Sequence, residues 1–255
     1  MSVVGDIYVK NISKSFQNGK KKTDVLENVN FTIHKNEFLV LFGPGQCGKS
    51  VLMEIIANLT DPDSGEIVCE DGRRLREEDI CMVFQRYALF PWKTCLQNVE
   101  LPMKFKGVPK EERHRKAKEY LKLVGLDGFE NSYPRQISGG MKQRVAIARA
   151  YAKECDLLLF DEPFGALDAQ TRYYMENELV KIWQRERKTV VFITNNIEEA
   201  VYLADRIITL GGAPSRIIDE FGIGLSRPRS RSDPDFLAIR KKIETHAVHS
   251  DILGG

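Results

Sequence analysis

Residues 38–50 read Phe-Leu-Val-Leu-Phe-Gly-Pro-Gly-Gln-Cys-Gly-Lys-Ser, and this stretch decides the fold. Its last eight residues, Gly43–Ser50, match the phosphate-loop pattern G-x-x-x-x-G-K-[ST] in full. The apolar run Phe38–Phe42 is typical of a buried strand, and Val51–Asn58 has the pattern of a helix. In a strand–loop–helix unit, the loop N–H groups and the positive end of the helix point at one spot. The stretch therefore predicts a nucleotide triphosphate site, with an ordinary glycine-rich turn as the alternative.

Two side chains of the loop carry the expected chemistry. Lys49 is expected to reach the β- and γ-phosphates, and the Ser50 hydroxyl is expected to bind Mg²⁺. Cys47 is expected to fill a tight turn as a small residue, with an oxidation-sensitive thiol as the alternative. The full set of loop residues expected at the nucleotide is Gly43, Pro44, Gly45, Gln46, Cys47, Gly48, Lys49, Ser50 and Val51.

Size and composition are those of an ordinary α/β protein. The chain has 255 residues, of which 42% are hydrophobic and 29% charged, and its formal net charge is +2. So small a net charge does not suggest nucleic acid as a partner. No apolar run approaches the roughly 20 residues that span a bilayer, and the N-terminus lacks the pattern of a secretion signal. The five cysteines include no C-x-x-C pair, which favours reduced cytosolic thiols over a disulfide frame or a metal site.

Strands and helices alternate at both ends of the chain, which predicts a mainly parallel sheet with helices on its faces. An antiparallel β region is expected before residue 38, with a polar loop over Gln17–Asp24. Buried strands are expected at Leu157–Phe160 and Thr189–Thr194. We expect one domain over residues 1–225, with a helical subdomain inserted at about 87–152, and a polar basic tail over 226–255.

A pair of carboxylates follows one of the buried strands. Asp161 and Glu162 come directly after Leu157–Phe160, and the carboxyl end of a central parallel strand is where such sheets bind ligands. Asp161 is therefore expected to hold Mg²⁺, and Glu162 to orient or deprotonate an attacking water. The alternative is a loop carboxylate pair that caps a turn before Pro163.

A second anion site is expected at the start of another helix. Ser138, Gly139 and Gly140 precede a helix that runs to about Ala152. A hydroxyl, free N–H groups and no side-chain bulk make an open anion site. Because Ser-Gly-Gly is also a common helix start, the segment alone is a weak signal. In a chain that also has a phosphate loop, it indicates a second contact to the γ-phosphate.

Taken in order, these segments resemble the nucleotide-binding subunit of an ABC transporter. The resemblance extends from about Ile7 to about Phe221 and rests on six segments: Gly43–Ser50, Gln85, Ile137–Met141, Arg144, Leu157–Glu162 and Gly165–Asp168. It implies an ABC ATPase fold, with a P-loop NTPase core, an N-terminal antiparallel β subdomain and an inserted helical subdomain. It also implies that the chain binds and hydrolyses ATP with Mg²⁺, as half of a head-to-tail homodimer or beside a paired ATPase subunit.

The resemblance implies further roles by position. Gln85 matches the loop glutamine that senses Mg²⁺, and Phe16 lies where the family stacks an aromatic ring on adenine, although a core aromatic is the alternative. Residues 166–168 match the loop that crosses the dimer interface. The catalytic set expected from the family is Glu162, Lys49, Gln85 and Asn195, and the metal set is Ser50, Gln85 and Asp161.

Finer similarity points to importers of the nitrate, sulfonate and taurine type, a related nutrient importer being the alternative. It rests on Val83–Gln85, Leu89–Trp92, Asn98-Val99 and Pro163–Asp168. The partners implied are membrane-spanning permease subunits and an extracytoplasmic solute-binding protein, with this chain peripheral at the cytoplasmic side of the cell membrane. The basic segment Ser226–Arg231 is expected to be a solvated linker, with a nucleic-acid or lipid patch as the alternative.

Three positions depart from the family pattern. Asn195 lies where the family has a histidine that contacts the γ-phosphate, Val51 replaces a common threonine, and Gln46 replaces a small residue. Asparagine can hydrogen-bond a phosphate oxygen but cannot act as an acid or base. We therefore expect ATP binding and dimerisation to be retained and hydrolysis to be slow. The other function that this departure favours is an ATP-gated switch with weak hydrolysis.

Overall fold

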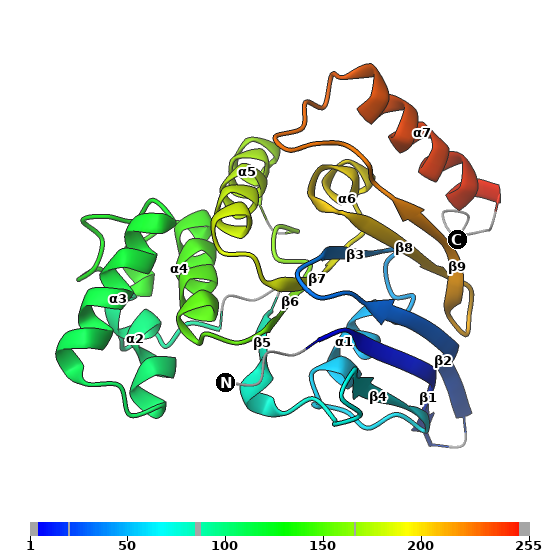
Figure 1. The fold of residues 1–255 in the computed structure, drawn as a ribbon, viewed down its shortest axis with the longest axis horizontal. Coiled ribbons are helices and arrows are strands. Elements are labelled where there is room, and N and C mark those ends of the chain that lie inside the picture. The colour runs from blue at the N-terminus through cyan, green and yellow to red at the C-terminus, as the bar shows by residue number, and fades with distance from the viewer. Residues whose placement is uncertain (1–4, 20, 85–87, 166, 250–255) are drawn as a thin grey trace. The chain divides into compact units, whose positions relative to one another are not determined.

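Strand β3 (Phe38–Phe42) lies at the centre of a parallel sheet (Figure 1). The computed structural model describes residues 5–19, 21–84, 88–165 and 167–249. The chain separates into two compact units, one made of residues 1–80 and 188–255 and the other of residues 81–187.

The sheet of the first unit is parallel around β3. Strands β7 (Thr189–Thr194) and β8 (Arg206–Gly211) both pair with β3 in parallel, and β9 (Arg216–Gly222) pairs with β8 in antiparallel fashion. All residues of β3 and β7 are buried, because the sheet is covered on both faces. The predicted mainly parallel arrangement is therefore present.

A second, antiparallel sheet of the same unit has the order β2-β1-β4, from β1 (Ile7–Asn18), β2 (Lys21–Ile33) and β4 (Ser64–Cys69). The polar loop expected over Gln17–Asp24 is wrong. Phe16 pairs with Thr23 and Gln17 with Lys22, so both strands continue into this region. The first four residues of β2 are exposed, and the hairpin therefore lacks the apolar alternation by which a strand is recognised in sequence.

The α-helices described in the first unit are α1 (Lys49–Ile56), α6 (Ile197–Leu203) and α7 (Pro234–His249). Helix α1 begins two residues before the expected start and ends at Ile56, beyond which Asn58 is left-handed, with φ 58°. The solvated linker expected at Ser226–Arg231 is also wrong in part, because Arg229 is buried and the Arg227 side chain is only 8% exposed.

The second unit is mainly helical. Helices α2 (Cys95–Phe105), α3 (Lys110–Leu123) and α4 (Gly139–Ala152) pack against one another, and α5 (Ala169–Arg185) contacts α4. Its strands are β5 (Ile80–Val83), which begins at the unit boundary, and β6 (Leu157–Asp161). A short 3₁₀ turn of this unit lies at Pro134–Gln136, and another, at Glu77–Asp79, belongs to the first unit.

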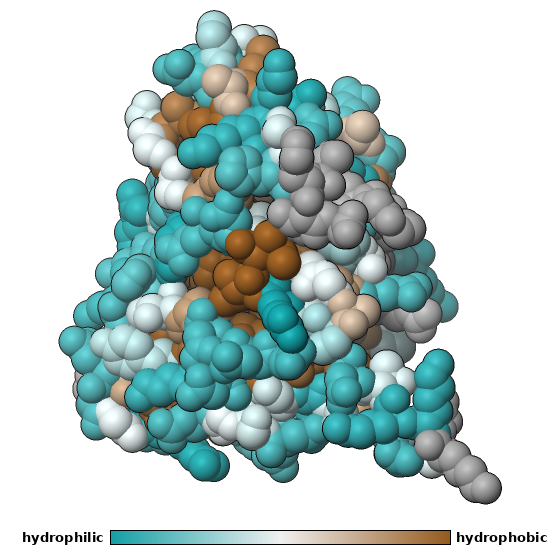
Figure 2. Space-filling view, turned by 90° about the vertical axis from the view of Figure 1, so that its right-hand side faces the viewer, coloured by the Kyte–Doolittle hydropathy of each residue, from teal (hydrophilic) through white to brown (hydrophobic). Residues whose placement is uncertain are grey.

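None of the helices that the structure describes has the length and apolar character needed to cross a bilayer. Figure 2 looks at the side of the molecule on which β9 and α7 lie in Figure 1. That face is mostly hydrophilic around a small apolar area.

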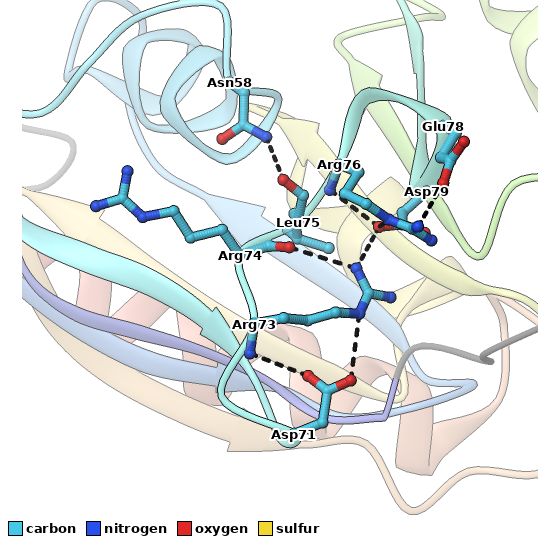
Figure 3. A network of polar contacts seen from close by, with 8 residues as sticks. All are labelled: Asn58, Asp71, Arg73, Arg74, Leu75, Arg76, Glu78 and Asp79. Carbon is cyan, nitrogen blue, oxygen red and sulfur yellow. Dashed lines mark hydrogen bonds and ion pairs between the residues drawn. The ribbon is translucent and has the colours of Figure 1, made fainter.

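A buried carboxylate fixes the segment that leads into β5 (Figure 3). Asp79 is 5% exposed and accepts hydrogen bonds from Arg73 Nη1 (2.6 Å), Arg76 Nη2 (3.1 Å) and the Arg76 backbone N–H (2.9 Å). Burial raises the pKa of Asp79, but the hydrogen bonds from Arg76 and Arg73 outweigh it and lower this pKa to about 2. The ionised carboxylate is therefore favoured in the folded state.

This depressed pKa predicts an acid-sensitive contribution to stability. The contribution is complete above the ordinary pKa of 3.8 and disappears as the pH falls towards about 2. Between pH 5 and pH 2 the native chain should lose about 2 kcal/mol more unfolding free energy than Asp79→Asn, measured by urea titration at each pH. Asp71→Asn is the control, because Asp71 is an exposed partner of the same Arg73 and should matter by less than about 1 kcal/mol. Parallel pH curves for the native chain and Asp79→Asn would contradict the prediction.

Candidate functional site

The phosphate loop joins β3 to α1 by a tight turn. The chain leaves β3 at Phe42, and Gln46 (φ 64°) and Gly48 (φ 92°) take left-handed conformations before Lys49 starts the helix. The Leu52 N–H donates to the Gly48 carbonyl at 2.9 Å and closes the first helical turn. The loop therefore leads directly into the N-terminus of α1, and a helix N-terminus beside such a loop is the arrangement that binds anions.

Close packing requires glycine at two loop positions. A Cβ at Gly43 would lie 2.4 Å from the carbonyl oxygen of Leu210 in β8. A Cβ at Gly48 would lie 2.9 Å from Val25 Cγ1 in β2, in addition to the strain of its positive φ. Gly45 is exposed and meets nothing within 4 Å. Neighbouring strands therefore fix the two ends of the loop while its tip stays open.

The ammonium group of Lys49 lies inside the loop. It donates to the carbonyl oxygens of Gly43 (2.9 Å) and Pro44 (2.6 Å), and Lys49 is only 4% exposed. Cys47 Sγ lies 3.7 Å from the same ammonium and 4.0 Å from the Leu210 carbonyl. The buried thiol supports the interpretation of Cys47 as a small packing residue. The loop thus holds a fixed positive charge where the sequence predicts the phosphates.

Asn195 lies at the same edge of the sheet as the loop. In the parallel register Phe42 pairs with Thr194, so Gly43 and Asn195 leave the sheet at one level. Asn195 is exposed. It is therefore placed to reach a ligand bound at the loop through its side-chain amide.

The next residue, Asn196, has a structural role that our sequence reasoning missed. It is the N-cap of α6, and its Oδ1 accepts the backbone N–H groups of Glu198 (2.9 Å) and Glu199 (3.3 Å). The signal was present in the sequence, because asparagine followed by two glutamates is typical of a helix start.

Phe16 is half-exposed on β1, opposite Thr23 of β2. The Phe16 ring therefore lies on the β1-β2 hairpin. Val25 of the same hairpin packs next to Gly48 of the phosphate loop. Lys14 Nζ lies 5.5 Å from the centre of the ring and also pairs with Asp63 at 3.1 Å. An exposed ring is available for stacking, which a core aromatic is not.

The predicted carboxylates belong to the second unit. Asp161 is the last residue of β6, and Glu162 has the left-handed φ of 42°. A left-handed backbone at a residue other than glycine is strained and is concentrated at functional sites. The Gly165 N–H donates to the Glu162 carbonyl at 3.2 Å and closes the turn.

The Ser-Gly-Gly segment forms the start of α4 as predicted. Ser138 is the N-cap, and its Oγ accepts the Met141 N–H at 3.3 Å. A Cβ at Gly140 would lie 2.9 Å from Thr171 Cγ2 of α5. Asp168 caps α5 by accepting from the Thr171 N–H (2.9 Å) and Thr171 Oγ1 (2.7 Å). The backbone hydrogen bond from Thr171 lowers the pKa of Asp168.

The predicted site residues are thus divided between the two units. The first unit brings together Gly43–Val51 and Asn195, and it also carries Phe16. The second carries Asp161, Glu162 and Ser138–Gly140. Gln85 and Ala166 lie outside the described residues, and the roles expected for all of these positions stay predictions.

Comparison with known proteins identifies the family. A family model described as ABC transporter matches residues 26–165. An uncharacterized ABC transporter ATP-binding protein of Methanocaldococcus jannaschii is 48% identical over 92% of this chain and 88% of its own. The aliphatic sulfonates import ATP-binding protein SsuB of Bacillus cereus is 41% identical over 93% of this chain and 94% of its own.

Solved structures confirm the α/β fold class. A dimeric ATP-binding cassette in a post-hydrolysis state, bound to ADP and Pi, superposes with a TM-score of 0.76 at 36% identity. The match covers 86% of this chain and all of that one.

The loop geometry predicts unequal effects of alanine at two glycines. Gly48→Ala should lower the unfolding free energy by about 1–3 kcal/mol, because it adds both strain and a contact with Val25. Gly45→Ala is the matched control and should change it by less than about 0.5 kcal/mol. Urea unfolding of the native chain and of the two variants measures the difference. Equal unfolding midpoints for Gly48→Ala and Gly45→Ala would show that position 48 does not require glycine.

Proposed function

The chain belongs to the ABC transporter family, and we propose that it binds and hydrolyses ATP to drive import of a small solute through separate membrane-spanning permease subunits. The observation that carries this proposal is the phosphate loop at the sheet edge, with the buried Lys49 charge inside it and Asn195 beside it. The family binds ATP or ADP in such cassettes.

In this proposal the backbone N–H groups of Gly45–Val51 hold the phosphates, with Gly43 and Pro44 forming the start of the loop, and Phe16 stacks on the adenine ring. The Lys49 ammonium turns from the Gly43 and Pro44 carbonyls towards the β- and γ-phosphates. The exchange is supported by the chemistry of the group, since an ammonium carries three donors and forms stronger hydrogen bonds with charged oxygens than with carbonyls.

The residues present fit a Mg²⁺ ion that accompanies ATP. Ser50 is exposed in the first turn of α1, and Asp161 ends β6, so hard oxygen donors are available at both positions. Among the residues that the structure describes, no three His, Cys, Asp or Glu side chains gather at one point. Mg²⁺ keeps water and phosphate oxygens as most of its ligands and would neutralise charge on the phosphates when bound. Gln85 completes the proposed metal set.

Hydrolysis is assigned to Glu162 as the base that orients and deprotonates the attacking water. Lys49 stabilises the charge that develops on the γ-phosphate, and Asn195 donates a hydrogen bond to it through the amide. The Asn195 amide cannot take up or release a proton near neutral pH, whereas a histidine can. We therefore infer slower ATP hydrolysis than in a relative with histidine at this position.

The active form is proposed to be a head-to-tail dimer or a pair with a second ATPase subunit. Each ATP would then lie between Gly43–Ser50 of one copy and Ser138–Gly140 of the other. The exposed Ser138 at the N-terminus of α4 supports a role in binding an anion. The dimeric cassette among the similar structures is consistent with this assembly.

The solute class is inferred from the relatives. Similarity to the sulfonate importer of Bacillus cereus supports a small anion of the nitrate, sulfonate or taurine type. We propose that an extracytoplasmic binding protein delivers the solute and that this chain lies at the cytoplasmic side of the membrane, bound to the permease.

Glu162→Gln tests the assignment of the base. The variant should bind ATP with little change but hydrolyse it at least about 100-fold more slowly, because the amide cannot accept a proton. Phosphate release and fluorescent-nucleotide binding, both measured on the purified chain with its permease, give the two quantities. Glu119→Gln, an exposed carboxylate on α3, is the control. Unchanged turnover in Glu162→Gln would remove Glu162 from the catalytic set.

Asn195→His tests the departure from the family. Restoring an imidazole should raise turnover several-fold, because it returns a donor that can also carry charge at the γ-phosphate. Asn195→Gln keeps the amide and should show no gain. A histidine variant no faster than the native chain would refute the inference that Asn195 slows hydrolysis.

The second candidate function, an ATP-gated switch, is favoured by the same Asn195. It predicts that ATP binding alone changes the state of the membrane complex while phosphate release stays near background. Steady phosphate release that rises with solute in the reconstituted complex excludes the switch and supports the importer.

A further inference from the structure

The helix that follows Asn195 is too short to be stable without contacts from the rest of the protein. Helix α6 has seven residues and no basic residue in its last turn. Short helices are marginal in isolation, and their last carbonyls lack internal partners. Its N-terminus is capped by Asn196, so the groups left to satisfy are those at its C-terminal end.

Two arginines from the C-terminal segment satisfy that end. Arg229 donates through Nη1 to three carbonyl oxygens, those of Val201 (2.7 Å), Tyr202 (3.1 Å) and Ala204 (2.7 Å). Arg227 donates to the Leu203 carbonyl and pairs with Asp205. Four successive carbonyls at the end of α6 therefore accept from guanidinium groups, whose charge also suits the negative end of the helix.

The Arg229 side chain is buried and makes further hydrogen bonds outside α6. It is 8% exposed, and its Nη2 also donates to the Leu225 carbonyl at 3.0 Å. Burial, together with the nearby charge of Arg227, lowers the pKa of Arg229 to about 10, which leaves it charged at neutral pH. A planar guanidinium can serve several carbonyls at once, and an ammonium cannot match that geometry.

Helix α7 holds the other end of α6. Phe236, Arg240 and Ile243 lie at i, i+4 and i+7, which puts them on one face of α7. Phe236 and Ile243 are buried, and Arg240 Nη1 lies 2.5 Å from Oε1 of Glu198 in the first turn of α6. Figure 1 shows α7 running beside α6, and the two helices are in contact.

We propose that Arg229 and Arg240 are positioning residues that hold α6 at its two ends and thereby fix Asn195 beside the phosphate loop. This rests on the proposed function, in which Asn195 contacts the γ-phosphate. Thr194 is fixed by its pairing with β3, so the backbone before Asn195 is held by the sheet. After Asn195, the Asn196 N–H donates to Thr194 Oγ1 at 2.9 Å, and beyond it the backbone is held by α6, whose Glu198 lies three residues after Asn195. Loosening α6 therefore weakens the restraint on Asn195 from its C-terminal side while leaving the phosphate loop in place.

The first test is hydrogen exchange of the α6 amides in the full chain. Arg240→Gln should speed exchange in residues 198–204 by about two- to five-fold, as expected for a half-exposed ion pair. Arg229→Lys keeps the positive charge but loses the planar guanidinium that donates to several carbonyls at once. This substitution should speed hydrogen exchange in residues 198–204 by about ten-fold or more. Lys241→Gln removes the same charge from the neighbouring, exposed position of α7 and should leave exchange unchanged.

The second test is a kinetic cycle with Asn195. Arg240→Gln should lower kcat for ATP by about two- to five-fold with KM changed little, because the phosphate loop is untouched. In an Asn195→Ala background the same substitution should have no further effect on kcat, since the group that it positions is gone. A merely structural role would lower kcat equally in both backgrounds.

The outcomes separate the two proposals. Unchanged α6 exchange in Arg240→Gln and Arg229→Lys overturns the positioning role, and so do additive effects in the Asn195→Ala background. A native chain that hydrolyses no ATP overturns the proposed function instead. The exchange measurement then still decides whether the two arginines hold α6.

Discussion

The parallel register of three strands is the constraint on which the candidate site depends. Phe42 of β3 lies level with Thr194 of β7 and Thr209 of β8, so β3 and β7 end at one level while β8 continues for two residues to Gly211. Gly43 and Asn195 leave the edge at this level, and the Leu210 carbonyl of β8 supports the back of the loop. Backbone hydrogen bonds between these strands hold this alignment, and because almost all of their residues are buried, it cannot slip without exposing apolar residues.

The sequence predicts what is local and periodic. The run Phe38–Phe42, the loop pattern after it and the cap at Ser138 were all recognised, because strand, turn and helix start each have a signal within a few residues. The fold class followed from their order. The hairpin at Gln17–Asp24 escaped recognition because its exposed strands have no apolar face. Arg229 escaped it for a different reason: its partners lie 25 to 28 residues away in sequence.

The two adjacent asparagines show how a site can change in one respect and be preserved in another. Asn196 caps α6 with the same geometry that an aspartate provides, since both side chains offer an oxygen to the first N–H groups. Asn195, by contrast, is exposed at the edge of the sheet. Asn196 therefore has a structural role as a helix cap, whereas the departure from the family pattern at Asn195 is one of side-chain chemistry.

The contacts of Lys49 bear on how substitutions at this lysine are interpreted. Its ammonium ties the Gly43 and Pro44 carbonyls together across the start of the loop. Removing the side chain would abolish a contact to phosphate and would also release two carbonyls that its charge now orients. When a substitution of Lys49 weakens nucleotide binding, the loss of affinity therefore has two contributions. One is the lost contact with phosphate, and the other is the lost preorganisation of the loop. Only comparison with a ligand lacking the terminal phosphates separates the two contributions.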